Sequence, residues 1–110
     1  MSNTLRIVGK VIELAPMRYT PAGVAVVNCV LGHASRQIEN GVERDVECEL
    51  PAVAIGDMAQ QMRVAGCGWE LEATGFLAAK SKRSKLPVLH ITNIKFLEGI
   101  DNGVQTEESK

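Results

Sequence analysis

The sequence predicts an all-β fold of five short strands, with one short helix between the third and the fourth. Apolar and polar residues alternate with a period of two over much of the chain, and clusters of Gly, Pro and Asn-Gly separate the alternating runs. One segment, 57–64, has helical spacing instead. With 110 residues, the chain is of a size that fits a single domain.

The first predicted strand, 5–12, places Leu5, Ile7 and Val11 on one face. Gly9 lies in the middle of this strand, where glycine is typical of a bend or a bulge. A small barrel needs such a bend to curl its first strand, so Gly9 favours a closed sheet.

The second predicted strand, 24–31, is apolar on both faces, which predicts that both faces are buried. In a small barrel one strand face meets the core, and the other face needs a cover. A second subunit is the simplest cover, so this strand predicts a homodimer.

The third predicted strand, 43–50, follows Asn40-Gly41, a pair typical of a two-residue hairpin turn. Pro51 either interrupts this strand or places it at a sheet edge. One face of this strand is acidic and would repel phosphate. It therefore either faces away from a ligand or forms ion pairs with neighbouring basic side chains. Its members are Glu43, Asp45, Glu47 and Glu49.

The helix, 57–64, is predicted to end at Gly66. The fourth strand, 69–79, is expected to be interrupted at Gly75, and the fifth strand is 88–96. This order predicts an OB-fold, a five-stranded barrel that binds oligonucleotides through its second and third strands and the adjacent loops. The position of the helix argues against an SH3-like barrel.

A basic loop, 80–85, joins the last two predicted strands and contains no acid. The net charge of the chain is −1, so this loop is a local exception. It is typical of a phosphate-binding loop, with a solubilising loop tip as the alternative. Phosphate contacts predict salt-dependent binding, and the lack of a base-specific pair predicts little sequence preference.

The segments 18–24, 48–51 and 75–77, and a basic loop that closes on 88–90, resemble the PriB family (primosomal replication protein N). The resemblance covers residues 3–97. It implies a dimeric OB-fold that binds single-stranded DNA as an accessory protein of replication fork restart. It further implies that the protein stabilises the complex of the helicase PriA with DNA and helps to recruit DnaT.

The resemblance and the basic loop together assign a set of cations to DNA contact: Arg18, Arg44, Lys80, Lys82, Arg83 and Lys85. Val42 and Glu47 stand where family members can place stacking aromatic residues. Since stacking contributes about 1–3 kcal/mol per base, we expect weaker and more salt-sensitive binding here. Tyr19 and Trp69 are the candidates for base stacking, with packing in the fold as the alternative for each.

Two other functions remain open. The chain is similar to general single-stranded DNA-coating proteins, but it lacks their long glycine- and glutamine-rich linker. It also fits a protein-only adaptor whose basic loop docks on an acidic partner. Within the chain we expect an OB-fold domain at 1–97 and a flexible acidic tail at 98–110.

Several classes of function are disfavoured. The sequence contains no nucleophile elbow, metal-binding spacing or phosphate-cradling glycine loop, so it predicts neither an enzyme nor a bound metal or cofactor. Three widely spaced cysteines predict no disulfide framework. With no secretory signal and no long apolar run, we expect a cytoplasmic protein that does not enter membranes.

Overall fold

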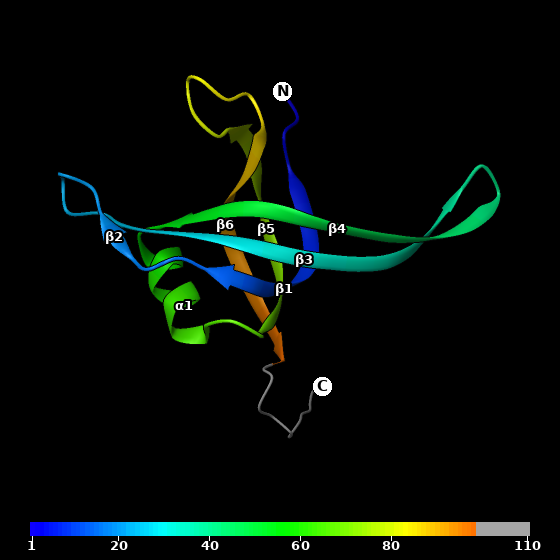
Figure 1. The fold of residues 1–110 in the computed structure, drawn as a ribbon, viewed down its shortest axis with the longest axis horizontal. Helices are drawn as coiled ribbons and strands as arrows, with labels where there is room; N and C mark the ends of the chain where they lie inside the picture. Colours follow the sequence, from blue (N-terminus) through cyan, green and yellow to red (C-terminus); the bar gives the residue numbers. More distant parts are fainter. Residues whose placement is uncertain (99–110) are drawn as a thin grey trace.

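The computed structural model describes residues 1–98 (Figure 1). The tail predicted for 98–110 lies outside the described residues, apart from Glu98, which ends the last strand. The strands and the helix are β1 (Leu5–Leu14), β2 (Arg18–Tyr19), β3 (Ala25–Glu39), β4 (Val42–Ile55), α1 (Asp57–Ala65), β5 (Glu70–Ala79) and β6 (Pro87–Glu98).

The strands form one sheet in the order β1-β5-β6-β4-β3-β2, and an additional pairing of β1 with β3 closes it into a ring. β4 and β6 pair in parallel, whereas the other neighbours are antiparallel. The two-residue β2 is an addition to the five predicted strands. This five-stranded closed sheet with one helix between β4 and β5 confirms the predicted OB-fold.

The core fills the inside of the ring. It consists of alternate residues from the strands and of Ala59 and Met62 from α1, both fully buried. The helix begins after Gly56 and ends at Gly66, and both glycines have positive φ. No helix within the described part of the chain is long and apolar enough to cross a membrane.

β3 and β4 are longer than predicted, and beyond the barrel they form a two-stranded ribbon over residues 33–48 (Figure 1). At its tip Asn40 and Gly41 have φ of 54° and 78°, as a two-residue type I′ turn requires. The predicted end of the second strand at residue 31 was wrong. Since solvent reaches both ribbon faces, residues 33–39 of β3 lack the apolar alternation that marks a half-buried strand.

Pro51 lies at an edge and does not interrupt β4. It sits opposite Val30 of β3, and the second neighbour of β4, the strand β6, pairs only from Ala52 to Ala54. The missing N–H of proline is tolerated where the other side of the strand is unpaired.

The prediction that Gly75 interrupts the strand β5 was wrong. The strand continues through Gly75, and its register with β6 shifts between Thr74 and Gly75. A Cβ on Gly75 would lie 1.9 Å from the carbonyl oxygen of His90, closer than any real contact. Glycine therefore lets β5 and β6 approach at this bulge, where the Thr92 hydroxyl donates a hydrogen bond to the Thr74 carbonyl over 3.2 Å.

The prediction that both faces of 24–31 are buried holds in part. Val27 lies in the core, and on the opposite face Val26 is 4% exposed within this single chain. Asn28 on that face is exposed. The face is therefore covered in part by its own chain, and the homodimer stays a prediction.

The three cysteines are free, and they differ in burial. Burial, with the Cys67 thiol as a lesser cause, raises the pKa of the Cys29 thiol from 9.0 to about 11. Because the thiolate is the reactive form, a thiol reagent at pH 8 should label the exposed Cys48 and Cys67 and spare Cys29 until the protein unfolds. Mass spectrometry of protein labelled with and without urea measures this, and native labelling of all three thiols at one rate would contradict it.

Candidate nucleic-acid interface

The barrel has an outward face formed by the side chains of β3, β4, β6 and β5 that point away from the core. One row of paired residues crosses all four strands. Asn28 pairs with Val53, Val53 pairs with His90, and His90 pairs with Phe76. The residues that we group as the outward face are Val26, Asn28, Val30, Pro51, Val53, Ile55, Phe76, Ala78, Val88 and His90.

A hollow of about 520 Å³ opens on this face. Arg18 and Lys80 line it together, although 62 positions separate them in the sequence. The pairing of β2 with β3 brings Arg18 beside Val26, and the Arg18 Nη2 donates to Asn28 Oδ1 over 3.4 Å. The hollow thus contains two of the predicted DNA-contacting cations, together with one acid, Glu13.

The basic loop continues from the rim of this hollow, and its own hydrogen bonds hold it closed. The Lys80 N–H donates to the Leu86 carbonyl over 2.9 Å, and the Ser81 N–H donates to the Ser84 carbonyl over 3.2 Å. The Ser81 hydroxyl accepts hydrogen bonds from the N–H groups of Arg83 and Ser84, at 3.2 and 3.1 Å. The Ser81 hydroxyl therefore shapes the loop backbone.

The four cations of the basic loop, Lys80, Lys82, Arg83 and Lys85, are exposed. None of the ion pairs found among the side chains of residues 1–97 involves them. In Figure 1 the loop, in yellow, lies on the opposite side of β3 and β4 from α1. It therefore presents a cluster of charge next to the hollow, where an anionic polymer can reach both.

Arg44 lies elsewhere. It pairs with Gln37 on the ribbon, on the side that continues the core-facing positions of β3 and β4, and it forms an ion pair with Glu39. The structure does not bring it together with Arg18 and the basic loop. Sequence alone missed this because the face of a ribbon residue depends on the register.

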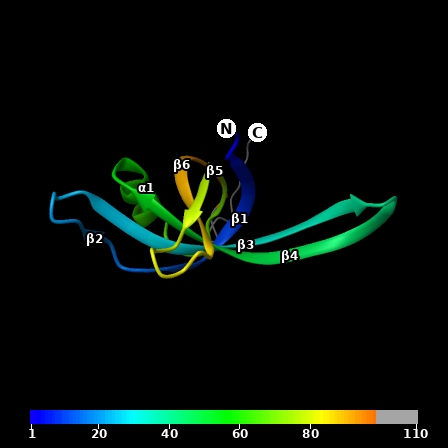
Figure 2. The same ribbon diagram turned by 90° about the horizontal axis from the view of Figure 1, so that it is seen from above.

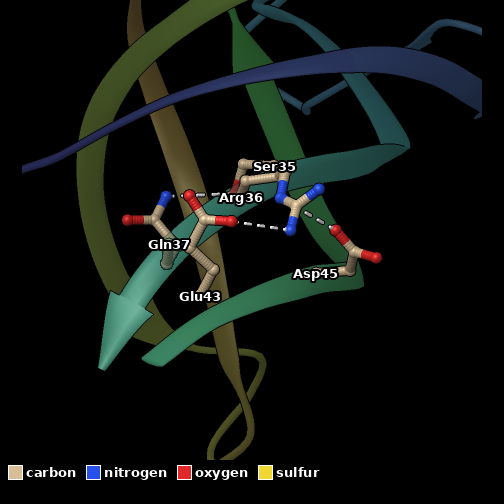
Figure 3. A network of polar contacts seen from close by, with 5 residues as sticks. All are labelled: Ser35, Arg36, Gln37, Glu43 and Asp45. Atoms are coloured by element: carbon tan, nitrogen blue, oxygen red, sulfur yellow. Dashed lines mark hydrogen bonds and ion pairs between the residues drawn. The ribbon is translucent and has the colours of Figure 1, made fainter. Parts of the chain in front are cut away.

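The ribbon side that continues the outward face is acidic. Arg36 Nη2 contacts Glu43 at 3.0 Å, and Arg36 Nε contacts Asp45 at 3.4 Å (Figure 3). Glu47 and Glu49 lie on this side too, opposite Ala34 and Gly32, and take part in no ion pair found among the side chains of residues 1–97. Their charge repels phosphate along the ribbon, so a nucleic acid is better placed on the barrel.

The predicted stacking residues also lie off the outward face. Tyr19 is 62% exposed but pairs with Ala25, on the side of the strand opposite Arg18. Trp69 meets Phe96 edge to face, with ring centroids 5.7 Å apart, and both line an apolar hollow beside α1. Trp69 therefore packs beside α1. Figure 2 shows α1 above the layer of β3 and β4.

An aromatic pair that sequence reasoning missed lies on the outward face instead. Phe76 and His90 stack with ring centroids 5.1 Å apart and an interplanar angle of 10°. Their pairing depends on where the hairpin closes, which the loop bounds alone do not fix. Counting outward from residues 79 and 86, which flank the basic loop, would place Phe76 opposite Leu89, whereas the observed pairing starts from Ala79 and Pro87.

No group of three or more His, Cys, Asp or Glu side chains in residues 1–98 is arranged to hold a metal ion. The absence of enzyme activity and of a cofactor stays a prediction. The face has an apolar floor, a cationic rim and one aromatic pair, in which Phe76 is exposed and His90 is half-buried, and this is the geometry of a binding surface.

Known proteins resemble this chain in sequence over most of its length. The profile of a family described as "Another single-strand binding protein family" matches residues 3–93. The replication restart protein PriB of Nitrosomonas europaea is 38% identical over 95 residues, which cover 86% of this chain and 88% of that protein. PriB of Neisseria meningitidis serogroup C is 39% identical over 98 residues, covering 89% and 97%.

The chain belongs to the PriB family. A crystallised PriB from Ralstonia solanacearum agrees, with a TM-score of 0.78 and 34% identity over 87% of this chain and 98% of that one. The single-stranded DNA binding protein of Thermus aquaticus is 24% identical, with a TM-score of 0.71 over 90% of this chain and 52% of that one, and shows the shared fold alone. The resemblance of the sequence to PriB is thus confirmed.

Proposed function

We propose that this PriB-family chain is a single-stranded DNA-binding accessory protein of replication restart. One observation carries the proposal: Arg18 and Lys80 line one hollow of the barrel, and the exposed cations Lys82, Arg83 and Lys85 follow Lys80 in the basic loop. The names of its relatives, replication restart protein and single-strand binding protein, support this function. The strand crosses the outward face, with phosphates at the cationic rim.

In this proposal the protein binds single-stranded DNA weakly and transfers it to its partner proteins. Val42 and Glu47 offer no aromatic ring, so charge supplies much of the affinity. A strand that is held mainly by exposed charges exchanges readily. This suits a protein that stabilises the complex of the helicase PriA with DNA and then passes the strand on as DnaT joins. The homodimer and the cytoplasmic location are part of the same proposal.

Binding to labelled oligo-dT should be salt-dependent. Fluorescence anisotropy at several salt concentrations should give a linear fall of log K with log salt, with a slope of about −0.7 per phosphate contacted. A duplex of equal length serves as the control, and we expect weaker binding to it.

The absence of oligo-dT binding at low salt, in protein shown to be folded, would contradict the proposal. The basic loop would then be a docking surface for an acidic protein, and the chain would act as an adaptor. Tight binding of oligo-dT that does not change with salt concentration would contradict the proposal that charge supplies much of the affinity.

A further inference from the structure

We propose that the Phe76–His90 pair is a stacking platform for a base of the bound strand. This inference rests on the proposed function, and it adds a base-contacting site to a face so far described by its charges. Phe76 is 41% exposed, and its ring lies parallel to that of His90, with centroids 5.1 Å apart. A phenyl ring that is partly exposed beside a cationic hollow is the arrangement that single-strand binders use for bases.

Two hollows meet at this pair. A second hollow, of about 350 Å³, is lined by Phe76, Thr92 and Met58 among others. It shares Val53, Ile55 and His90 with the larger hollow that contains Arg18 and Lys80. His90 thus lines both hollows, and a base that enters the second one reaches the rings without leaving the outward face.

The backbone beside Phe76 is fixed on both sides. The side chain of Asn3 donates to the Leu77 carbonyl over 2.8 Å and accepts from the Leu77 N–H over 2.9 Å, which occupies the free edge of β5. On the other edge, Gly75 allows the close approach to His90 described above. A stacking ring held on a rigid strand loses little freedom when a base binds.

The spacing suits one strand that contacts both the rim and the platform. Lys80 follows Phe76 by four residues, a distance of about 13 Å along a strand. A short stretch of one strand can therefore place a phosphate at Lys80 and a base on Phe76.

The other aromatic residues are poorly placed for this role. The chain contains one Trp, one Tyr and two Phe. Trp69 and Phe96 pack against each other beside α1, and Tyr19 lies on the opposite side of β2 from Arg18. Phe76 is therefore the aromatic residue that shares a face with the hollow.

The test compares oligo-dT with an abasic oligonucleotide of equal length, which has the same phosphates and no bases. For the variant Phe76→Leu, we expect oligo-dT binding to fall about five- to hundredfold, while abasic binding and the salt slope stay unchanged. Phe76→Tyr retains the ring and should keep the preference for oligo-dT. The matched control, Phe96→Leu, removes a ring beside α1 and should also keep it.

The outcomes separate the two proposals. If the unmodified protein binds oligo-dT and Phe76→Leu binds it equally well, the platform is overturned and the proposed function stands. Equal weakening for both oligonucleotides overturns the platform as well. If the unmodified protein binds neither oligonucleotide, the proposed function fails and the platform fails with it. Should Phe76→Leu not fold, His90→Leu removes the second ring and is judged by the same comparison.

Discussion

Reversing two charges of the basic loop, in the variant Lys82→Glu/Arg83→Glu, is expected to weaken oligo-dT binding at low salt by about tenfold or more. Both side chains are exposed, and neither has an ion-pair partner among the side chains of residues 1–97. The loss of two phosphate contacts should also reduce the salt slope by about 1.4 in magnitude. Anisotropy titrations of both proteins over a salt series measure both changes.

The matched control is Arg63→Glu/Lys95→Glu, which makes the same change in net charge. These cations are exposed on α1 and β6 and do not line the hollow. We expect this control to retain most of the affinity. Equal losses in the two variants would mean that net charge, rather than the basic loop, holds the strand.

Replacing Gly75 with alanine is expected to lower the free energy of unfolding by about 2–3 kcal/mol or more, toward the upper range of overpacked sites. The new methyl group would lie 1.9 Å from the oxygen and 2.8 Å from the carbon of the His90 carbonyl. These atoms belong to the backbone of β6, so relief requires the two strands to separate. Urea unfolding followed by circular dichroism should show a midpoint lower by about 1–2 M.

Gly32→Ala is the control for this experiment. The nearest atom to a Cβ on Gly32 is the Ile12 Cγ2, at 3.1 Å, and a side chain can move aside. We therefore expect a cost below about 1 kcal/mol. If the two variants were equally destabilised, the close approach at Gly75 would not be the cause.

Periodicity and turn chemistry were enough to predict the barrel. Strands with one face in the core alternate in sequence, and Asn40-Gly41 marks its turn without any tertiary information. The extension of β3 into the ribbon could not be predicted in the same way, because solvent on both faces leaves residues 33–39 without an apolar alternation. The effects of Pro51 and Gly75 on their strands were harder still to predict. Whether a strand continues through a proline or a glycine depends on which neighbouring strand is present and how closely it approaches.

The charged part of the site was easier to predict than its geometry. A run of cations between two strands identifies a basic loop. Which residues of other strands lie beside that loop, on the same face of the sheet, depends on the register of the strands. Arg44 lies on the core-facing side of the ribbon, and alternation along β2 places Tyr19 on the side opposite Arg18. The pairing of His90 with Phe76 depends on where the hairpin of β5 and β6 closes, at Ala79 and Pro87, and the bounds of the basic loop do not fix that point.

The ribbon has a consequence for how copies of the chain behave in concentrated solution. Over residues 33–39 and 42–48 its two strands pair with each other and, within residues 1–98, with no further strand. Such open edges invite strands from other molecules, and charged side chains are a common protection. The carboxylates of Glu43, Asp45, Glu47 and Glu49 supply mutual repulsion along one side. We therefore expect these carboxylates to disfavour pairing of the ribbon edges with the strands of a second molecule.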